Sequence, residues 1–178
     1  MSMRLPTPFL VIATQNPVEQ SGTFELPEAQ LDRFMLLHRL GYPGRDEEQD
    51  ILQRQLGMGL RKEEGGAVPK TAFDMIDGSP VGTAADLVAA MESVQQVHVS
   101  EVFLKHSVEL VRRTRESKLL DFGCSPRAGL ALVNAARARA AVDAREYVLP
   151  DDVKALAPAV LRHRLLLSPA AEIEGKQV

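Results

Sequence analysis

The sequence predicts a short α/β region near its start followed by a mainly α-helical region, so the fold is expected to be mostly α overall. Two apolar runs with branched side chains, Phe9–Ala13 and Phe34–Leu37, are typical of buried strands. After about residue 80, apolar side chains recur instead at the spacing of amphipathic helices. The chain has 178 residues, 45% hydrophobic and 25% charged, which suits one medium domain or two small ones.

The first apolar run ends in Thr14-Gln15-Asn16-Pro17, which places polar groups at the carboxyl end of the expected strand. Ligands bind at that edge of open α/β sheets, so Asn16 is a candidate site residue. The simpler alternative is that Asn16 forms a turn before Pro17.

A two-turn helix is predicted between the two strands, over Leu26–Arg33. Pro27 suits its first position, and Glu28 in the first turn complements the helix dipole. Arg33 then falls at the helix end, where its side chain can reach a partner. Alternatively, Arg33 forms a surface ion pair with Asp32 or Glu28, which contributes little to stability.

The middle of the chain predicts one helix and then a linker. Gly41–Gly44 reads as a turn, and Gly44 can cap a helix that runs from Arg45 to Gly57. The interval from Gly57 to Gly82 is rich in glycine and has little periodicity, so we expect the domain boundary there. Within it, Thr71–Ile76 can form a short helix.

The remaining elements are predicted from caps and periodicity. Helices are expected from Thr83, Ser100, Ser125 and Pro150, with short extended pieces over Val97–Val99 and Arg162–Leu167. The helix Ser125–Val142 is the strongest, because Ser125 can cap it, Pro126 suits its first position, and its many alanines favour helix and close packing. Leu149 offers no cap oxygen before Pro150, so Asp151 and Asp152 must supply the favourable charge at that helix start.

Composition argues against several classes of protein. A net charge of -3 and a pI near 5.8 give no electrostatic footprint for nucleic acid. The run Arg112–Arg115, and the arginines near 137 and 162, lack interleaved aromatics and read as a solvated face or subunit contact. His98 and His106 have no third ligand at metal spacing. With one cysteine, Cys124, no apolar run of membrane-spanning length and no signal core, a cytoplasmic location is expected.

Five segments together resemble the MoxR family of AAA+ ATPases, from about Pro8 to Leu167: ATQNP, GTFELPEAQLDRF, GYPGRDEEQDIL, CSPRAGLALVNAARARA and YVLPDDVKALAPAVLRHRLLL. The resemblance implies that residues 1–57 are the C-terminal part of a P-loop AAA+ core. It also implies a linker over 58–79, a helical lid over 80–167 and a tail over 168–178.

The resemblance assigns three roles. Asn16 matches the sensor that helps to place the attacking water, Arg33 matches the arginine finger that reaches a neighbouring subunit's nucleotide, and Arg127 matches the second sensor, which contacts bound ATP. Guanidinium groups suit these roles because their fixed donors match the oxygens of a phosphoryl group. Without the resemblance, Arg127 is an ordinary first-turn residue, although a cation there opposes the helix dipole and hints at a compensating anion.

Two parts of such an ATPase are absent from the sequence: the glycine-rich phosphate loop and the acidic pair that holds magnesium. The one Gly-Lys pair, Gly175-Lys176, is followed by Gln177 in a polar tail. For the whole protein, the resemblance implies a hexameric ring ATPase that uses ATP and magnesium and remodels or activates partners such as von Willebrand factor A-type proteins. This chain alone is expected to be inactive and to bind neither cofactor. The alternatives are a non-catalytic helical interaction module and, less favoured, a DNA-binding module.

The missing core segment also has a structural consequence. In the AAA+ fold, the phosphate-loop strand lies between the strand that ends at Asn16 and the strand that begins at Phe34. Without it, the two surviving strands would stand about twice the usual ~4.8 Å apart, with unpaired backbone groups. We expect them to pair with each other or with a second copy of the chain, or else to be poorly ordered.

Overall fold

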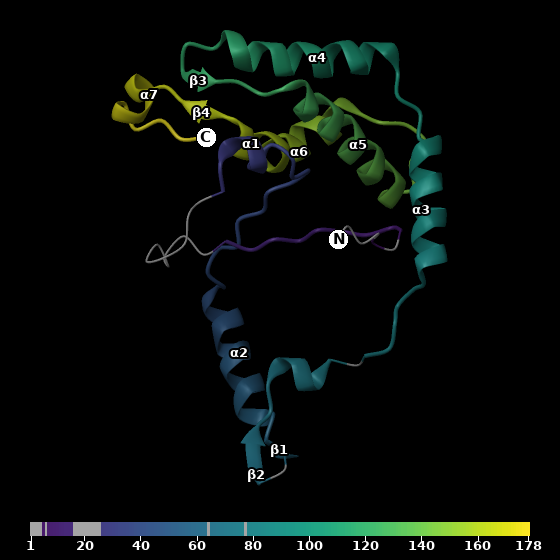
Figure 1. The fold of residues 1–178 in the computed structure, drawn as a ribbon, viewed down its shortest axis with the longest axis vertical. Coiled ribbons are helices and arrows are strands. Elements are labelled where there is room, and N and C mark those ends of the chain that lie inside the picture. Colours follow the sequence, from purple (N-terminus) through teal and green to yellow (C-terminus); the bar gives the residue numbers. More distant parts are fainter. Residues whose placement is uncertain (1–4, 6, 16–25, 64, 77) are drawn as a thin grey trace. The chain divides into compact units, whose positions relative to one another are not determined.

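The computed structural model describes residues 5, 7–15, 26–63, 65–76 and 78–178 (Figure 1). The chain divides into two compact units, one formed by Met1–His38 with Ala84–Val178 and the other by Arg39–Thr83. Among the described residues, no helix is both long and apolar enough to cross a membrane.

The smaller unit contains the expected helix and a hairpin that the sequence analysis missed. Helix α2 spans Arg45–Gly57, and the Glu47 carboxylate accepts a 2.8 Å hydrogen bond from the Gly44 backbone N–H. Strands β1 (Leu60–Glu63) and β2 (Gly66–Pro69) pair antiparallel within the interval expected to be an irregular linker. Gly65, in the turn between them, has a φ of +103°, a conformation that L side chains rarely adopt. The short helix expected over Thr71–Ile76 is the 3₁₀ turn η1, Ala72–Met75.

The larger unit is built mainly from four helices: α3 (Ala84–Gln96), α4 (Glu101–Glu116), α5 (Pro126–Val142) and α6 (Pro150–Leu161). Their starts follow the predicted caps. The hydroxyls of Ser100 and Ser125 accept hydrogen bonds from the first turns of α4 and α5. At α6 the Asp152 carboxylate accepts a 2.8 Å hydrogen bond from the Leu149 N–H, so the negative charge expected at this helix start also binds the backbone of the cap residue.

Short elements complete this unit. Helix α1 spans Glu28–Leu31, the 3₁₀ turn η2 spans Arg162–Arg164, and α7 spans Pro169–Ile173. Strands β3 (Leu120–Phe122) and β4 (Leu166–Leu167) pair antiparallel. The segment Arg162–Leu167, expected to be extended throughout, is therefore extended only at its end. The extended piece at His98 is confirmed by a parallel bridge to Tyr147.

The core of the larger unit lies around α5, which packs against both α4 and α6 (Figure 1). Apart from Leu132, the buried side chains of α5 are all alanines: Ala128, Ala131, Ala135, Ala136 and Ala140. Small side chains let neighbouring helices approach closely, as expected from the sequence. Leu132 and Val160, which have no exposed area, fill the centre.

The two apolar runs near the start do not form the expected strands. Residues 9–15 and 34–37 carry no strand assignment, so their direct pairing is excluded and the expectation is wrong for both segments. Phe9, Leu10 and Ile12 are 60%, 81% and 79% exposed. A strand exists only through its ladder partners, and the described residues offer none to this segment. Pairing with a second copy of the chain stays a prediction.

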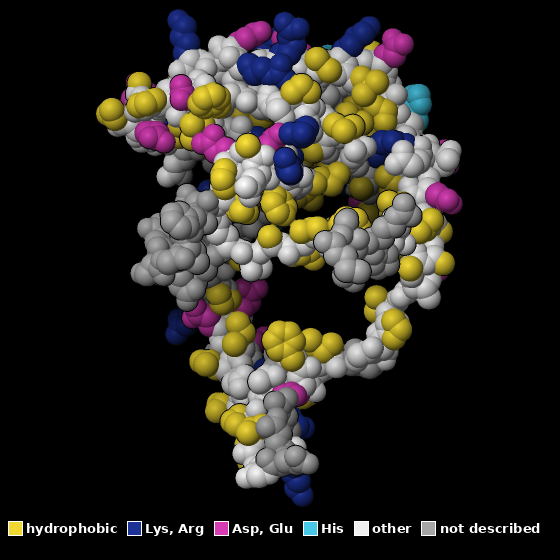
Figure 2. All heavy atoms as spheres, in the orientation of Figure 1, with side chains coloured by type: hydrophobic (Ala, Val, Ile, Leu, Met, Phe, Trp, Pro, Cys, Tyr) yellow, Lys and Arg dark blue, Asp and Glu magenta, His cyan; other side chains and the backbone are white. Residues whose placement is uncertain are grey.

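Hydrophobic side chains also lie at the surface elsewhere. Figure 2 shows them on the region of α2, where three apolar side chains are exposed: Ile51, Leu52 and Leu56. Many apolar side chains of the described residues are thus not buried.

Candidate functional site

Asp32, which follows α1, is bound by three side chains from the far end of the sequence. The Ser125 hydroxyl lies 3.0 Å from both of its carboxylate oxygens. The Arg164 Nε donates to Oδ1 at 3.0 Å, and the Arg127 Nη1 lies 3.4 Å from Oδ2. The Asp32 side chain is 17% exposed, so this cluster is partly shielded from water.

Local hydrogen bonds position both Asp32 and Ser125 for this contact. The Asp32 N–H donates to the Glu28 carbonyl at 2.9 Å and the Arg33 N–H to the Gln30 carbonyl at 3.1 Å, which fixes the turn after α1. On the other side, the Ser125 hydroxyl caps α5 by accepting from the Arg127 N–H while it donates to Asp32. The carboxylate therefore lies beside the positive end of α5, which favours its ionised form.

Arg164 is the most enclosed member of the cluster, with a side chain only 2% exposed. Its guanidinium group reaches five acceptors: Asp32 Oδ1 and the carbonyl oxygens of Asp32, Phe34, Met35 and Val160. A guanidinium has five N–H donors in a fixed fork, so the group is fully used. It joins the turn after α1 to the end of α6.

The electrostatics of Asp32 result from two opposed effects. Burial raises the pKa of the Asp32 carboxyl, while hydrogen bonds from Ser125, Arg127 and Arg164 lower it, and the net result is a pKa below the usual value. The carboxylate is therefore ionised at neutral pH and can balance the buried charge of Arg164.

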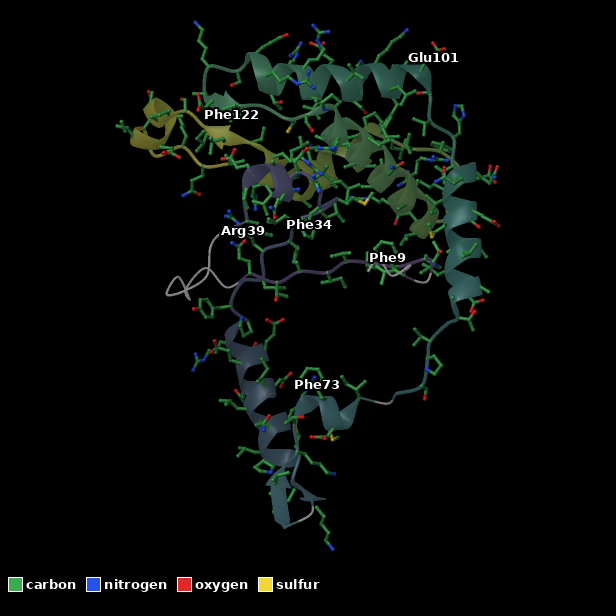
Figure 3. All side chains as sticks on the ribbon, viewed as in Figure 1. Phe9, Phe34, Arg39, Phe73, Glu101 and Phe122 are labelled. Carbon is green, nitrogen blue, oxygen red and sulfur yellow. The ribbon has the colours of Figure 1, made fainter. Side chains whose placement is uncertain are left out.

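His163 adds a second link between the same segments. Its Nε2 lies 3.1 Å from the carbonyl oxygen of Phe34, which can only accept, so Nε2 carries the proton and donates. Nδ1 is buried without a hydrogen-bond partner among the described residues. Burial lowers the pKa of the His163 imidazole below its usual value, so the ring is neutral at pH 7. Phe34 is labelled in Figure 3, below the turn that follows α1.

Two of the three predicted site residues border this cluster. Arg33 is exposed in the turn held by Arg164, directly beside Asp32. Arg127 has a 65% exposed side chain and forms an ion pair with Asp32. Arg127 thus pairs with the residue that directly precedes Arg33, although the two arginines are 94 residues apart in the sequence. Asn16 lies outside the described residues.

The sequence analysis missed Asp32, His163 and Arg164 as members of a site. Arg164 was interpreted as part of a solvated or subunit-contact surface, and its burial shows that the solvated interpretation is wrong for this residue. A signal was present in the sequence: Arg164 directly precedes three leucines, and an arginine in an apolar run is seldom buried unless it is paired. Its partner, however, lies 132 positions earlier and has no local signature.

The other basic run does not form a continuous charged patch. Arg113 pairs with Glu109 at 3.0 Å on the exposed face of α4. Arg115 is exposed as well, but its Nε donates to the Cys124 carbonyl at 2.7 Å. Two arginines of the run Arg112–Arg115 therefore already have partners within the chain, which argues against a nucleic-acid site there.

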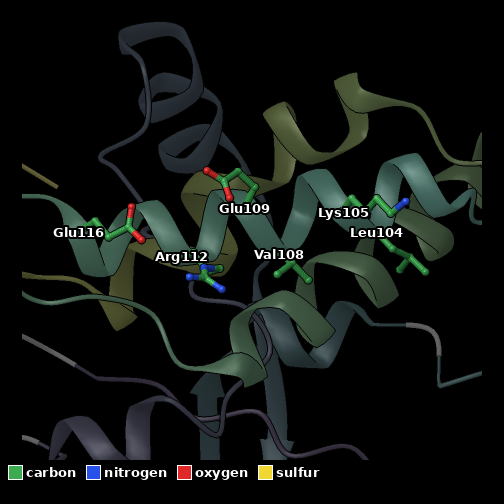
Figure 4. Close-up of a pocket in the computed structure, with 6 residues that line it drawn as sticks. All are labelled: Leu104, Lys105, Val108, Glu109, Arg112 and Glu116. Atoms are coloured by element: carbon green, nitrogen blue, oxygen red, sulfur yellow. The ribbon is translucent and has the colours of Figure 1, made fainter.

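Two surface hollows lie away from the Asp32 cluster. One, of about 410 Å³, runs along a single side of α4 and is lined by Leu104, Lys105, Val108, Glu109, Arg112 and Glu116 (Figure 4). The other, of about 300 Å³, lies between α4 and the start of α6 and includes Phe103, His106 and Val153. Neither hollow is lined by Arg33 or Arg127, so neither supports a nucleotide site on its own.

Comparison with known proteins gives a family match for each of the two segments that form the Asp32 cluster. Residues 1–36 match the ATPase family associated with various cellular activities (AAA), and residues 112–178 match the AAA lid domain. The first match contains Asp32 and Arg33, and the second contains Arg127 and Arg164. The Chaperone MoxR1 of Mycobacterium tuberculosis is 38% identical over 173 residues, which cover 92% of this chain and 42% of that protein. The chain belongs to the MoxR family of AAA+ ATPases.

Two further matches cover nearly the whole chain. The uncharacterized protein YeaC of Bacillus subtilis is 41% identical over 176 residues, which cover 99% of this chain and 51% of YeaC. A solved structure from Cytophaga hutchinsonii, assigned as an ATPase, is 35% identical with a TM-score of 0.81, covering 98% of this chain and 52% of that one. The predicted fold class, an α/β AAA+ fragment followed by a helical lid, is confirmed by this likeness. The chain spans about half the length of the curated relatives it matches.

Proposed function

We propose that the whole protein hydrolyses ATP with magnesium as a ring, and that it uses the energy to remodel or activate partner proteins. The observation that carries this proposal is the Asp32 cluster, which gathers the turn bearing Arg33 and the lid residue Arg127 around one carboxylate. Both arginines are exposed there, as groups that meet a nucleotide must be. The proposed ring is a hexamer, and the proposed location is the cytoplasm.

In this proposal the two arginines act on different nucleotides. Arg33 reaches the ATP held by the neighbouring subunit and stabilises the charge on the transferring phosphoryl group, a role that is worth roughly 10³–10⁵ in rate in related enzymes. Arg127 contacts the nucleotide of its own subunit. Its single 3.4 Å contact with Asp32 is weak enough to be exchanged for a phosphate oxygen. Asn16 orients the attacking water.

The remaining parts of the nucleotide site must be supplied by the rest of the whole protein. The 178 residues contain no glycine-rich phosphate loop with its Lys, and no acidic pair that could end a strand and hold magnesium. We therefore propose that this chain by itself neither hydrolyses ATP nor binds it tightly. Partners of the von Willebrand factor A type belong to the same proposal and rest on the family resemblance alone.

Mixing of mutant subunits in the whole protein tests the catalytic part. Arg33→Ala should abolish most turnover while leaving ATP binding intact, because a finger acting in trans does not hold its own subunit's nucleotide. Rings that mix Arg33→Ala with Asn16→Ala subunits should regain turnover, since some interfaces then pair an intact site with an intact finger. Arg39→Ala, which removes a nearby exposed arginine, is the matched control and should retain activity. Unchanged turnover in Arg33→Ala would end the assignment.

A non-catalytic interaction module is the second candidate, and one observation favours it. Helix α4 presents Val102, Leu104 and Val108 to solvent, with exposures of 61%, 43% and 58%. Exposed apolar residues on one helix often mark a protein contact. If the whole protein neither binds nor hydrolyses ATP, this candidate replaces the first.

A further inference from the structure

The turn that carries Arg33 receives more hydrogen bonds from Arg164 than from any other side chain among the described residues. Arg164 donates to the backbone carbonyls on both sides of Arg33: to Asp32 at 3.1 Å, to Phe34 at 2.6 Å and to Met35 at 3.4 Å. It also binds the Asp32 carboxylate at 3.0 Å. Four consecutive residues, Asp32 to Met35, therefore surround one guanidinium group, and Arg33 is the charged residue among them whose side chain is exposed.

The anchor itself is rigidly placed. Arg164 lies at the end of η2, directly after α6, and its Nη1 also donates to the Val160 carbonyl in the last turn of that helix. Val160 has no exposed area and belongs to the main core cluster. Arg164 thus connects the Arg33 turn to the packed core of the helical region.

We infer that Arg164 is a positioning residue for Arg33, which sets the direction in which the Arg33 side chain leaves the surface. This inference rests on the proposed role of Arg33 in trans. Its chemical basis is the number of donors. The five N–H groups of a guanidinium lie in one plane and can bind a carboxylate and several carbonyls together. A lysine has only three donors, on an ammonium group at the end of a flexible side chain. A conservative Arg164→Lys change should therefore keep the charge opposite Asp32 but release the turn.

A consequence for the ring follows from the same contacts. Because Arg164 belongs to the segment after α6, any displacement of α6 is transmitted to the Arg33 turn through the guanidinium group. A displacement of about 1 Å at a catalytic group can cost about 100-fold in rate. Arg164→Lys should accordingly lower the turnover number of the whole ring by about 100-fold, with little change in the KM for ATP.

The first test uses this chain and measures the order of the turn directly. A spin label is attached at Arg33→Cys, and its mobility is compared with and without Arg164→Lys. A label at Leu130→Cys, on the exposed side of α5, reports general loosening. The native thiol, Cys124, is 1% exposed, and labelling of the unsubstituted chain gives the background. Arg162→Lys, the same change two residues earlier, is the matched control.

We expect Arg164→Lys to mobilise the label at position 33 and not the label at position 130, while Arg162→Lys changes neither. Unaltered mobility at position 33 would overturn the inference. Equal mobilisation at both positions would overturn it too, because Arg164 would then only stabilise the helical region as a whole.

The second test separates positioning from simple damage in the whole ring. Arg164→Lys subunits should regain turnover when mixed with Asn16→Ala subunits, as Arg33→Ala subunits do, and should not regain it when mixed with Arg33→Ala subunits. Absence of rescue by Asn16→Ala subunits, where Arg33→Ala is rescued, overturns the positioning role alone. Absence of rescue for Arg33→Ala itself counts against the proposed function, and the label mobility then still decides whether Arg164 holds the turn.

Discussion

The Asp32 carboxylate and the Arg164 guanidinium group meet at 3.0 Å across 132 residues of sequence. One lies in the segment that matches the AAA ATPase family and the other in the segment that matches the AAA lid domain. The pair therefore joins the two parts of the chain on which its family membership rests. It also brings Arg127 beside the turn that carries Arg33.

Replacement of Asp32 by asparagine should lower the free energy of unfolding by about 3 kcal/mol, because it leaves the buried charge of Arg164 without a counter-ion. Urea unfolding of the chain, followed by far-ultraviolet circular dichroism, measures the loss. Glu109→Gln breaks the exposed pair with Arg113 and should change stability by less than about 1 kcal/mol.

The Asp32→Asn effect should also depend on pH with a defined sign. The folded state lowers the pKa of Asp32, so the stabilisation is complete above the carboxyl's ordinary pKa and is lost as the pH falls through the lowered value. The wild type and the variant should therefore converge in stability in strong acid. A difference that stays constant from pH 7 to pH 2 would contradict this account.

His163 should make the protein less stable in mild acid. Burial lowers its pKa below 6.5 in the folded state, so the unfolded chain binds the proton more readily, and stability falls as the pH drops below that value. His163→Gln, whose side-chain amide can still donate to the Phe34 carbonyl, should flatten the dependence between pH 7 and pH 5. Urea midpoints at each pH test this, and a dependence in His163→Gln as steep as in the wild type would contradict it.

Two glycines should respond to alanine in opposite directions. At Gly123 a Cβ atom would lie 2.5 Å from the Arg115 backbone nitrogen and 2.6 Å from the Thr114 carbonyl carbon, and backbone cannot easily yield. Gly123→Ala should destabilise the fold by about 2 kcal/mol. At Gly129, inside α5, the nearest atom would be 3.7 Å away, so Gly129→Ala should stabilise by up to about 1 kcal/mol. Thermal unfolding of both variants measures the difference.

Leu132 and Leu130 lie two positions apart on α5 and differ only in burial. Leu132 has no exposed area, and Leu132→Ala should cost about 3 kcal/mol through the cavity it leaves. Leu130 is 64% exposed, and Leu130→Ala should change stability by less than about 0.5 kcal/mol. Equal losses at both positions in urea unfolding would show that the core is not packed as described.

The sequence by itself determined the parts of the fold whose signals are local. The start of α5 follows from Ser125 and Pro126, because a cap and a fixed φ act within one turn of helix. The start of α6 follows in the same way from Asp152, whose carboxylate reaches back to the Leu149 N–H. A local pattern also placed Arg33 at the end of a helix, whereas Arg127 was indicated by the family resemblance.

Only the tertiary structure decided which of these residues belong together. The burial of Arg164 depends on Asp32 and on three backbone carbonyls near the other end of the chain, and no local pattern encodes such a partnership. The tertiary structure also decided that Phe9–Ala13 does not form a strand. A strand-like composition is not sufficient for a strand, because its backbone hydrogen bonds must come from partners that the described part of this chain does not provide.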